Sequence, residues 1–283
     1  MNPYLITEPT CISFSGGRTS AYMLYQVLQA HDGKMPDQAI VCFANTGKEE
    51  ENTLKFVHDC SVNWGVKIHW IEYQDHEDPI NRYKEVTYET AARNGEPFEA
   101  IIRKRNYLPN PVTRFCTSEL KIRTMACFLK QSGLFDDCSK SELENASWIG
   151  LRYDEARRAA KIVDKRRIPL YTAGVTVQHI SEFWDKQEFN LELPTYKGRT
   201  LAGNCDLCFL KPMNQVATLI AEKPERAIWW AQIKALALAS RPDGATFRKD
   251  RPSYASMVQF ASQQLSMFDQ DEEGIACFCG DYV

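Results

Sequence analysis

The sequence predicts an α/β protein in which a doubly wound, mostly parallel sheet precedes a smaller, cysteine-rich and mainly helical C-terminal region. Two observations predict the sheet. Short apolar runs alternate with amphipathic helical segments in the first half of the chain, and the run QAIVCFA at Gln38–Ala44 is apolar almost throughout, as in a strand covered on both faces. A third observation, two close pairs of cysteines after residue 200, sets the C-terminal region apart.

The first three strands follow from hydrophobic patterning. A strand is expected at Thr10–Ser15, where it runs directly into a glycine pair and a helix with one apolar face. The second strand, Gln38–Ala44, precedes an amphipathic helix over Glu49–Cys60, and Val66–Glu72 alternates as a third strand. Strands separated by helices at this spacing predict a parallel sheet.

The segment 74–115 interrupts this rhythm. It is polar and contains Pro109 and Pro111, and we interpret it as an insertion over the active face with a helix around Ile80–Arg93. Its clustered basic residues are Arg103, Lys104, Arg105 and Arg114. Such a cluster is compatible with a local polyanion-binding patch, but runs of this kind more often lie on solvated faces.

The regular pattern returns after the insertion. We expect a helix at Ser118–Gln131, a fourth strand at Ala146–Leu151 and a helix at Thr176–Trp184 that begins with a threonine N-cap. Loop and helix are expected over Arg152–Arg167. A helical stretch over Met213–Ser240 dominates the C-terminal region.

Composition narrows the class of protein. The chain of 283 residues is 44% hydrophobic and 25% charged, with a net charge of −3, so it has no global attraction to nucleic acid or acidic membranes. No apolar run approaches the length of a membrane span, and the first residues do not resemble a signal peptide. We therefore expect a cytoplasmic protein with no membrane partner.

The segment Ser15–Ser20 (SGGRTS) is predicted to bind phosphate. Two glycines permit a tight turn that brings backbone N–H groups to an anion, and the following helix adds the positive end of its dipole. Ser15, Thr19 and Ser20 supply hydroxyls, and Arg18 supplies charge. The Walker A and dinucleotide fingerprints are both missing. The alternative is a glycine turn that merely joins strand to helix.

These residues resemble a known family. Ser13–Ser20 (SFSGGRTS) resembles the PP-loop of the ATP pyrophosphatases, within the adenine nucleotide alpha-hydrolase superfamily. Further segments resemble its phosphoadenosine phosphosulfate (PAPS) reductase branch in the same order: Asn45-Thr46-Gly47 its Asp-Thr-Gly, Arg114–Thr117 with Lys121 its cysteine-and-lysine segment, and Gly150-Leu151-Arg152 its Gly-hydrophobic-Arg segment. The resemblance covers roughly residues 10–170.

The resemblance implies a nucleotide site at the carboxyl edge of the sheet. The nucleotide-binding residues that it implies are Ser13, Ser15, Gly16, Gly17, Arg18, Thr19, Ser20, Asn45, Thr46, Gly47 and Gly150. Its implied catalytic residues are Cys116, Lys121 and Arg152. PAPS reductases commonly have a degraded loop, whereas ATP-cleaving members keep Ser-Gly-Gly-X-Asp/Thr-Ser. This chain keeps the second form, so ATP with Mg²⁺ is the expected nucleotide.

The cysteines predict a metal or cluster site. Five of the ten stand singly and read as small buried hydrophobic residues: Cys11, Cys42, Cys60, Cys127 and Cys138. Cys205-x-x-Cys208 and Cys277-x-Cys279 have spacings that let each pair reach one ion, and sulfur ligands suit Zn²⁺ and an iron–sulfur cluster equally. The alternative is a set of unrelated thiols.

A resemblance to cluster-containing adenylyl-sulfate reductases favours [4Fe–4S] over Zn²⁺ and adds Cys116 as a fifth candidate for four ligand places. We accordingly divide the chain into a PP-loop nucleotide-binding unit, 1–195, and a cysteine-rich unit, 196–283.

Three functions follow as hypotheses. The leading one is an enzyme that cleaves ATP to AMP and pyrophosphate to activate an acceptor, such as tRNA or DNA, for iron–sulfur-assisted sulfur transfer from a sulfur donor. The second is a PAPS or adenylyl-sulfate reductase that forms sulfite with a thioredoxin-like reductant. Against it, the PAPS reductase tail is Glu-Cys-Gly-hydrophobic-His, and here Phe278 replaces the acid and no histidine follows Cys279. The third is a non-enzymatic, metal-stabilised nucleotide-binding module.

Overall fold

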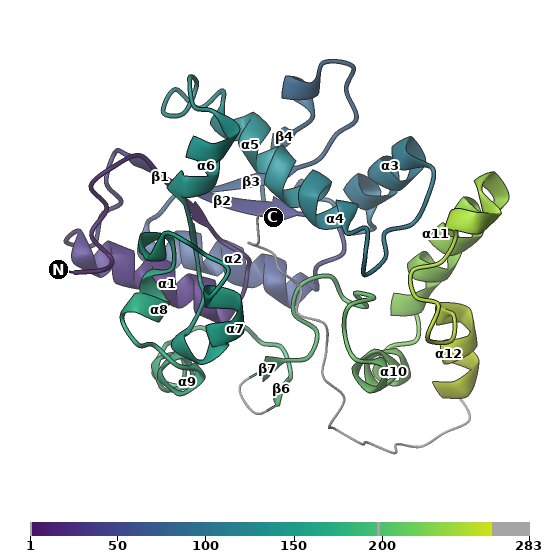
Figure 1. The fold of residues 1–283 in the computed structure, drawn as a ribbon. Helices are drawn as coiled ribbons and strands as arrows, with labels where there is room; N and C mark the ends of the chain where they lie inside the picture. The colour runs from purple at the N-terminus through teal and green to yellow at the C-terminus, as the bar shows by residue number, and fades with distance from the viewer. Residues whose placement is uncertain (1, 197–198, 262–283) are drawn as a thin grey trace.

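The computed structural model describes residues 2–196 and 199–261 and has an α/β architecture (Figure 1). The central sheet contains β1 (Thr10–Ser13), β2 (Ala39–Asn45), β3 (Ile68–Glu72), β4 (Lys84–Val86) and β5 (Ser147–Ile149). Its strand order is β4-β3-β2-β1-β5; β4 is antiparallel to β3 and every other pairing is parallel. The predicted α/β class with a mostly parallel sheet is confirmed.

Helices cover both faces of the sheet. The helices α1 (Arg18–Ala30) and α2 (Glu51–Trp64) lie on one face, and α5 (Thr124–Leu129) and α6 (Lys140–Ala146) lie on the other (Figure 1). Neighbouring residues of each strand enter opposite cores: Ile12 and Val41 pack in one cluster, Cys11 and Cys42 in the other. Both faces are therefore apolar, as the continuous run of the second strand predicted. The buried cysteines of the strands are core residues.

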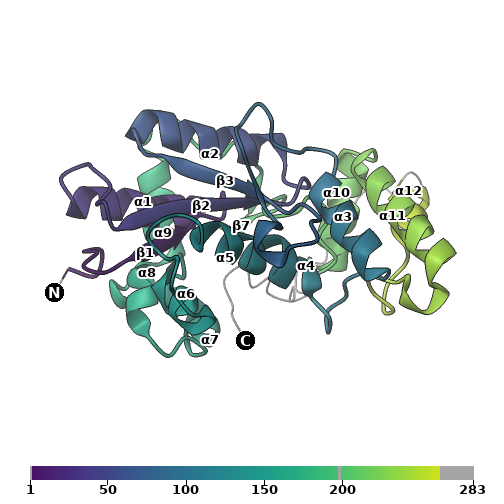
Figure 2. The same ribbon diagram turned by 90° about the horizontal axis from the view of Figure 1, so that it is seen from above.

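The insertion corrects one prediction. No helix spans Ile80–Arg93; β4 lies there instead, and the helix α3 (Glu96–Arg105) follows it. The strand forms because Trp70 pairs with Val86 across the sheet edge and the Lys84 ammonium lies 3.0 Å from the buried Glu72 carboxylate. A helix over these residues would lose that edge pairing. Figure 2 shows α3 beside the C-terminal helices.

The remaining elements of the first unit are short. The predicted helix at Ser118–Gln131 begins earlier, with α4 (Phe115–Thr117), and passes through a π-helix at Ser118–Arg123 before α5. Three further helices are α7 (Ala156–Ala159), α8 (Pro169–Thr172) and α9 (Val177–Trp184). The 3-10 helices are Pro79–Asn81, Tyr153–Glu155, Lys165–Arg167 and Pro242–Gly244. Thr176 is the N-cap of α9, as predicted.

The described part of the C-terminal region is mainly helical. Its elements are β6 (Thr195–Tyr196), β7 (Arg199–Thr200), α10 (Met213–Glu222), α11 (Arg226–Ser240) and α12 (Tyr254–Ala261). The single helical stretch predicted over Met213–Ser240 is wrong in one respect, because it divides near Pro224, which cannot continue a helix. Trp230 is fully buried against Phe247 and Tyr254, and this cluster is continuous with the core beside the sheet.

The helices also bear on the membrane question. In the part of the chain that the structure describes, no helix combines the length and apolar character needed to cross a membrane.

Candidate functional site

The loop after β1 is closed by its own hydroxyls. The Ser15 N–H donates to Ser20 Oγ at 3.2 Å, the two serine hydroxyls lie 3.0 Å apart, and the Ser20 hydroxyl donates to the Gly17 carbonyl at 2.9 Å. Ser20 is buried, so its hydroxyl holds the turn together, whereas Ser13, Ser15 and Thr19 are partly exposed. The loop is therefore pre-shaped before any ligand binds.

Two glycines make this loop possible. Gly16 has φ +74°, and a Cβ added there would lie 2.7 Å from Thr53 Cγ2 on α2. Gly150, which follows β5, lies so close to α1 that an added Cβ would be 3.1 Å from Ser20 Cα. Both positions require glycine because backbone and neighbouring helix approach each other closely. Gly150 therefore lies against the first turn of the helix that follows the loop, and its nucleotide-binding role stays a prediction.

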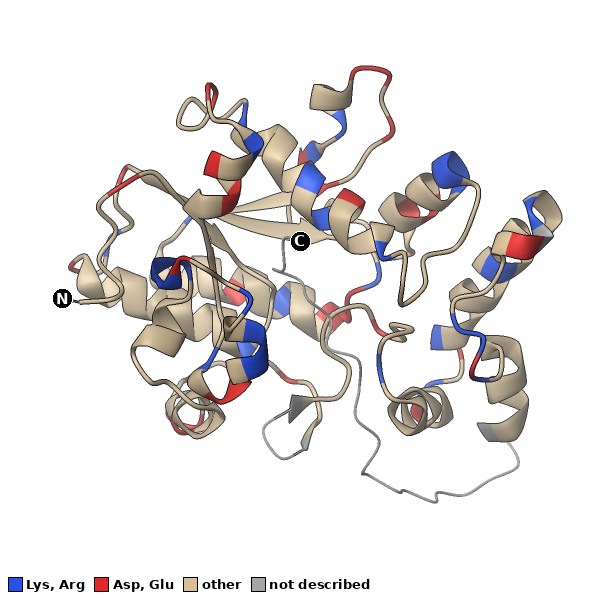
Figure 3. Cartoon of the chain, viewed as in Figure 1, with Lys and Arg blue, Asp and Glu red and all other residues tan. Residues whose placement is uncertain are grey.

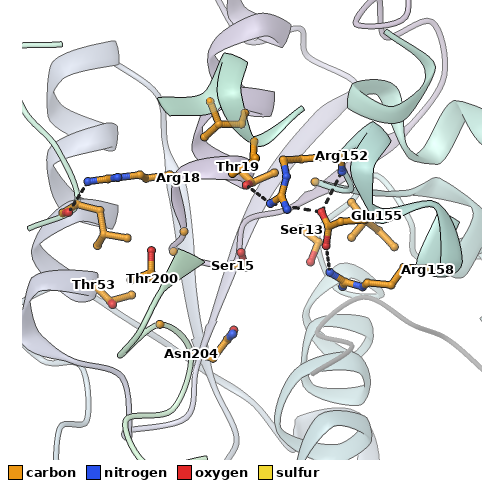
Figure 4. A pocket seen from close by; sticks show the side chains of 18 of the residues that line it. Ser13, Ser15, Arg18, Thr19, Thr53, Arg152, Glu155, Arg158, Thr200 and Asn204 are labelled. Carbon is orange, nitrogen blue, oxygen red and sulfur yellow. Dashed lines mark hydrogen bonds and ion pairs between the residues drawn. The ribbon is translucent and has the colours of Figure 1, made fainter. Parts of the chain in front are cut away.

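A pocket opens beside this loop (Figure 4). It is lined by Ser13, Ser15, Gly16, Gly17, Arg18 and Thr19 from the first strand and loop, and by Ile149, Gly150 and Arg152 from the fifth strand and its continuation. The chain leaves β1 toward β2 on one side and returns on the other side as β5, so the pocket lies where the strand order reverses. In open α/β sheets this crevice is the usual ligand site.

Arginine and hydroxyl groups meet on one wall of the pocket. Arg152 donates from Nη1 to Thr19 Oγ1 at 3.2 Å and from Nε to Asp154 at 3.0 Å. Glu155 accepts from the Arg152 backbone N–H at 3.0 Å and pairs with Arg158 Nη1 at 2.5 Å. Figure 4 shows both guanidinium groups with the loop threonine. The carboxylates of Asp154 and Glu155 thus orient two guanidinium groups beside the Ser15–Ser20 loop.

Arg18 lies on another wall and has a different environment. Its Nε donates to Asn190 Oδ1 at 2.8 Å, its Nη2 donates to the Leu191 carbonyl at 3.2 Å, and burial lowers its pKa. The Arg18 carbonyl accepts from the Trp184 indole at 3.0 Å. Arg18 therefore joins the Ser15–Ser20 loop to the segment after α9, and it also lines the pocket.

The C-terminal region completes the pocket. Thr200, Gly203 and Asn204 line it, immediately before the first cysteine of the Cys-x-x-Cys pair. Lys211 holds this segment, because its ammonium donates to the carbonyls of both Gly203 and Cys205 at 2.7 Å. The pocket is therefore built from both predicted units of the chain.

A second polar cluster lies at the end of β2. Thr46 donates its backbone N–H and its hydroxyl to the buried Glu49 carboxylate at 2.9 Å, and its hydroxyl lies 3.4 Å from Cys205 Sγ. Burial raises the pKa of the Cys205 thiol, and the Glu49 charge raises it further; Lys121 and the Thr46 hydroxyl oppose this shift. Cys116 also adds to the raised pKa, so both thiols lie within electrostatic reach of each other.

The predicted residues therefore divide into two groups. Ser13, Ser15–Thr19, Gly150 and Arg152 come together in the pocket, whereas Ser20, Asn45, Thr46 and Gly47 do not line it. Asn45 is fully buried; it donates to Glu72 at 2.7 Å and to the Ala92 carbonyl at 2.8 Å, and it accepts from the Gly47 N–H at 3.0 Å. This segment is a hydrogen-bonded turn on the cysteine side of the site.

The structure describes only some of the cysteines that were predicted to bind a metal. Cys277 and Cys279 lie outside the described residues. Cys208 is buried and lies within electrostatic reach of Tyr254. Over residues 2–196 and 199–261, no three histidine, cysteine, aspartate or glutamate side chains form a group that could hold a metal ion.

The basic cluster of the insertion is largely neutralised by nearby acids. Arg103 pairs with Glu99 at 2.5 Å, Lys104 pairs with Asp75, and Arg105 pairs with Glu119. Figure 3 shows acidic and basic segments interspersed there. No residue of 74–115 lines the pocket. Its elements pack against β3, α5 and α11, and the expectation that the insertion covers the active face stays a prediction.

Sequence reasoning missed several residues of the two clusters, among them Thr53, Glu49 and Asn204. Thr53 lines the pocket with a buried hydroxyl that has no hydrogen-bond partner. Glu49 organises the turn after β2, and Asn204 brings the C-terminal region to the pocket. A threonine three residues inside an amphipathic helix carries no local signal, whereas the Gly-Asn pair before Cys205 signals a turn.

The chain is similar to two proteins of uncharacterized function. It is 26% identical over 210 residues to the uncharacterized nin region protein ORF290 of Escherichia phage lambda, a match that spans 72% of this chain and 67% of the phage protein. It is 27% identical over 157 residues to an uncharacterized protein of Methanocaldococcus jannaschii, spanning 55% of this chain and 25% of that protein. No family model and no solved structure matches the chain.

Proposed function

We propose that this chain binds ATP with its phosphates on Ser15–Ser20 and cleaves it to AMP and pyrophosphate in order to activate an acceptor for sulfur transfer. The observation that carries the proposal is the position of the pre-shaped glycine loop at the point where the strand order reverses, opposite Arg152. The resemblance to PP-loop enzymes, including the intact Ser-Gly-Gly-X-Thr-Ser form, supports the same conclusion. The fold that this proposal implies is the doubly wound sheet of the adenine nucleotide alpha-hydrolases.

The proposed reaction has two steps. An acceptor oxygen attacks the α-phosphorus of ATP, the α–β bridging bond breaks, and pyrophosphate leaves while the acceptor carries AMP. A sulfur nucleophile then attacks the activated carbon and AMP departs. Mg²⁺ accompanies ATP as part of the substrate.

The loop residues have a direct role in the first step. Backbone N–H groups of Gly16, Gly17 and the first turn of α1 face the leaving pyrophosphate, and the helix dipole favours its negative charge. Arg152, oriented by Asp154 and Thr19, would neutralise charge that develops between the α- and β-phosphates. Such fixed donors lower the barrier because they need no rearrangement during reaction.

The cysteine cluster supplies the sulfur chemistry in this proposal. Cys205 lies beside the turn that follows β2, with its Sγ 3.4 Å from Thr46 Oγ1, and Cys116 and Lys121 are within electrostatic reach of it. Cys116 would carry a persulfide passed to it from a donor that is itself a persulfide, and the outer sulfur would attack the activated acceptor carbon and displace AMP. The Cys205 thiolate would then attack Cys116 Sγ and break the S–S bond, which leaves the sulfur on the acceptor as a thiolate and a Cys116–Cys205 disulfide that a dithiol reductant reduces. The described residues supply only part of a ligand set, so no step here passes through a cluster.

A [4Fe–4S] cluster remains part of the proposal as a separate question. Cys205 and Cys208, with Cys116 and the pair Cys277 and Cys279, supply five thiols for four places. An anaerobic absorption spectrum tests this directly. A broad charge-transfer band with bound iron and sulfide supports the cluster, whereas a colourless protein that contains zinc replaces it with the zinc alternative.

The test of the reaction compares two nucleotides under anaerobic conditions. The full chain is incubated with MgATP and a tRNA or DNA acceptor, or with PAPS and a dithiol, and pyrophosphate and sulfite are both measured. Pyrophosphate release from ATP, lost in Arg152→Met, supports the proposal. Sulfite release from PAPS supports the reductase alternative, and nucleotide binding without turnover of either compound supports a binding module.

A further inference from the structure

The segment from Thr200 to Cys205 connects the two clusters of the site. Thr200, Gly203 and Asn204 line the phosphate pocket, and Figure 4 shows Asn204 on the wall contributed by this segment. The next residue, Cys205, pairs with Glu49 as an isolated β-bridge and places its Sγ 3.4 Å from Thr46 Oγ1. One residue along the chain therefore separates the pocket from the cysteine side.

Asn204 has an unusual backbone conformation. Its φ is +59°, a left-handed value that few residues other than glycine adopt, although asparagine tolerates it better than most. The carbonyls on either side of it, those of Gly203 and Cys205, both accept from Lys211 Nζ at 2.7 Å. Asp206, the residue after Cys205, is fixed as well. Its N–H donates to the Lys48 carbonyl at 2.7 Å, and its carboxylate pairs with Lys48 Nζ at 3.1 Å.

These contacts hold the Asn204 side chain at the pocket while the backbone around it is clamped. An amide side chain offers two N–H donors without a charge, which suits an oxygen of a bound phosphate. A backbone held in a strained conformation beside a pocket is a reason to look for function there.

We infer that Asn204 binds the phosphate groups of the nucleotide and links occupancy of the pocket to the position of Cys205. The inference rests on the proposed function, because it assumes that phosphate binds on Ser15–Ser20. A ligand oxygen that accepts from the Asn204 amide adds a further restraint to the short segment that ends at Cys205, which Lys211 and Lys48 already hold. Binding of the ligand and burial of the thiol are then coupled, and the coupling acts in both directions.

Binding measurements on two variants of the full chain test the contact. Asn204→Gly keeps the left-handed backbone and removes the amide, and Asn204→Asp keeps the shape and places a carboxylate toward the phosphate. By calorimetry, we expect the affinity for inorganic pyrophosphate and for ATP to fall about tenfold in Asn204→Gly, as for one lost hydrogen bond to a charged group, and further in Asn204→Asp. Affinity for adenosine, which has no phosphate, should change less than about twofold in either variant.

Thiol labelling tests the coupling. The rate of Cys205 alkylation is followed by peptide mass spectrometry, with and without pyrophosphate at a concentration that saturates each variant. We expect pyrophosphate to slow labelling of Cys205 in the natural chain and to have no effect in Asn204→Gly. Equal protection in both chains, or none in the natural chain, overturns the coupling.

The failures are distinguishable. If the natural chain binds neither pyrophosphate nor ATP, the proposed function fails and the inference fails with it. If the natural chain binds both ligands and each variant binds pyrophosphate as tightly as the natural chain does, the inference alone is overturned. Circular dichroism and a thermal melt of each variant confirm that the chain remains folded.

Discussion

The ends of two neighbouring strands, β1 and β2, carry similar sequence signals and are built differently. After β1, the partly exposed hydroxyls of Ser15 and Thr19 line a pocket. After β2, Asn45 and Thr46 are buried, and their polar groups are engaged by Glu72, Ala92 and Glu49. A small polar cluster with glycine at a strand end can therefore be either a ligand site or an internal turn. What distinguishes them is whether the polar groups face a pocket or are buried among neighbouring residues.

The chemical identity of residue 45 follows from this environment. The resemblance has an aspartate at this position of its Asp-Thr-Gly, whereas Asn45 here donates to the fully buried Glu72 at 2.7 Å. A second carboxylate would face the first without a proton between them. Asparagine is thus required by its partner, and the two positions must be read together.

The largest expected effect breaks the turn after β2. Asn45→Asp places two buried carboxylates together and should lower the free energy of unfolding by about 3 kcal/mol, in the range found when a buried charge is left uncompensated. Denaturant unfolding measures the change. The double variant Asn45→Asp with Glu72→Gln restores one donor to the pair and should recover most of the stability. Equal instability of the single and double variants would remove Glu72 from the explanation.

The next largest effect is a difference in stability between variants of two adjacent glycines, Gly16 and Gly17, in the loop after β1. Gly16→Ala forces a side chain at φ +74° and 2.7 Å from Thr53 Cγ2, so we expect a loss of about 2 kcal/mol from strain and displacement together. Gly17→Ala is the matched control, because the nearest atom to its added Cβ is 3.7 Å away and its φ is −107°. Thermal unfolding of the two variants should differ clearly. A similar melting temperature for both would contradict the described loop geometry.

Two arginines of the pocket are expected to behave in opposite ways. Arg18 is hydrogen-bonded to Asn190 and to Leu191, so Arg18→Met should lower stability by about 1 kcal/mol. Arg152 contacts Thr19, Asp154 and Glu155 at the pocket, so Arg152→Met should weaken ATP binding about tenfold, whereas Arg18→Met should change ATP binding little. Calorimetry and denaturant unfolding on both variants give the comparison. A larger loss of ATP affinity in Arg18→Met would reverse the assignment.

The smallest effect compares two threonines. Thr46→Val removes the hydroxyl that contacts Glu49 and Cys205 and should cost about 1 kcal/mol of stability without changing ATP affinity. Thr19→Val removes a pocket hydroxyl and should weaken ATP binding about threefold while stability stays the same. The two variants thereby test the contrast between an internal turn and an open site with nearly equal changes in side-chain shape.

The sequence carried the local features of the fold well. The strands at Thr10 and Gln38 were predictable because their apolar runs report burial directly, and Thr176 was predictable as an N-cap because capping is a local interaction. The strand β4 was not, because Lys84–Val86 is stabilised by pairing with β3 and by the contact between Lys84 and Glu72, which are separated in the chain.

The site shows the same division. The loop Ser15–Ser20 was predictable because a glycine turn between a strand and a helix has a local sequence signature. Thr53 and Asn204 reach the pocket only through the packing of α2 and of the C-terminal segment, which no local pattern reveals. The pairing of the basic insertion residues with Glu99, Asp75 and Glu119 also depends on tertiary structure. A cluster of charge in a sequence therefore says little until its partners are placed.

The most direct test of the central claim is competition between pyrophosphate and ATP for the natural chain, measured by calorimetry in the presence of Mg²⁺. If the loop after β1 holds the pyrophosphate part of ATP, pyrophosphate should displace ATP from a single site, and PAPS, which has a single sulfated 5′-phosphate, should bind more weakly than ATP. ATP binding that is unaffected by saturating pyrophosphate, together with tighter binding of PAPS, would contradict the account.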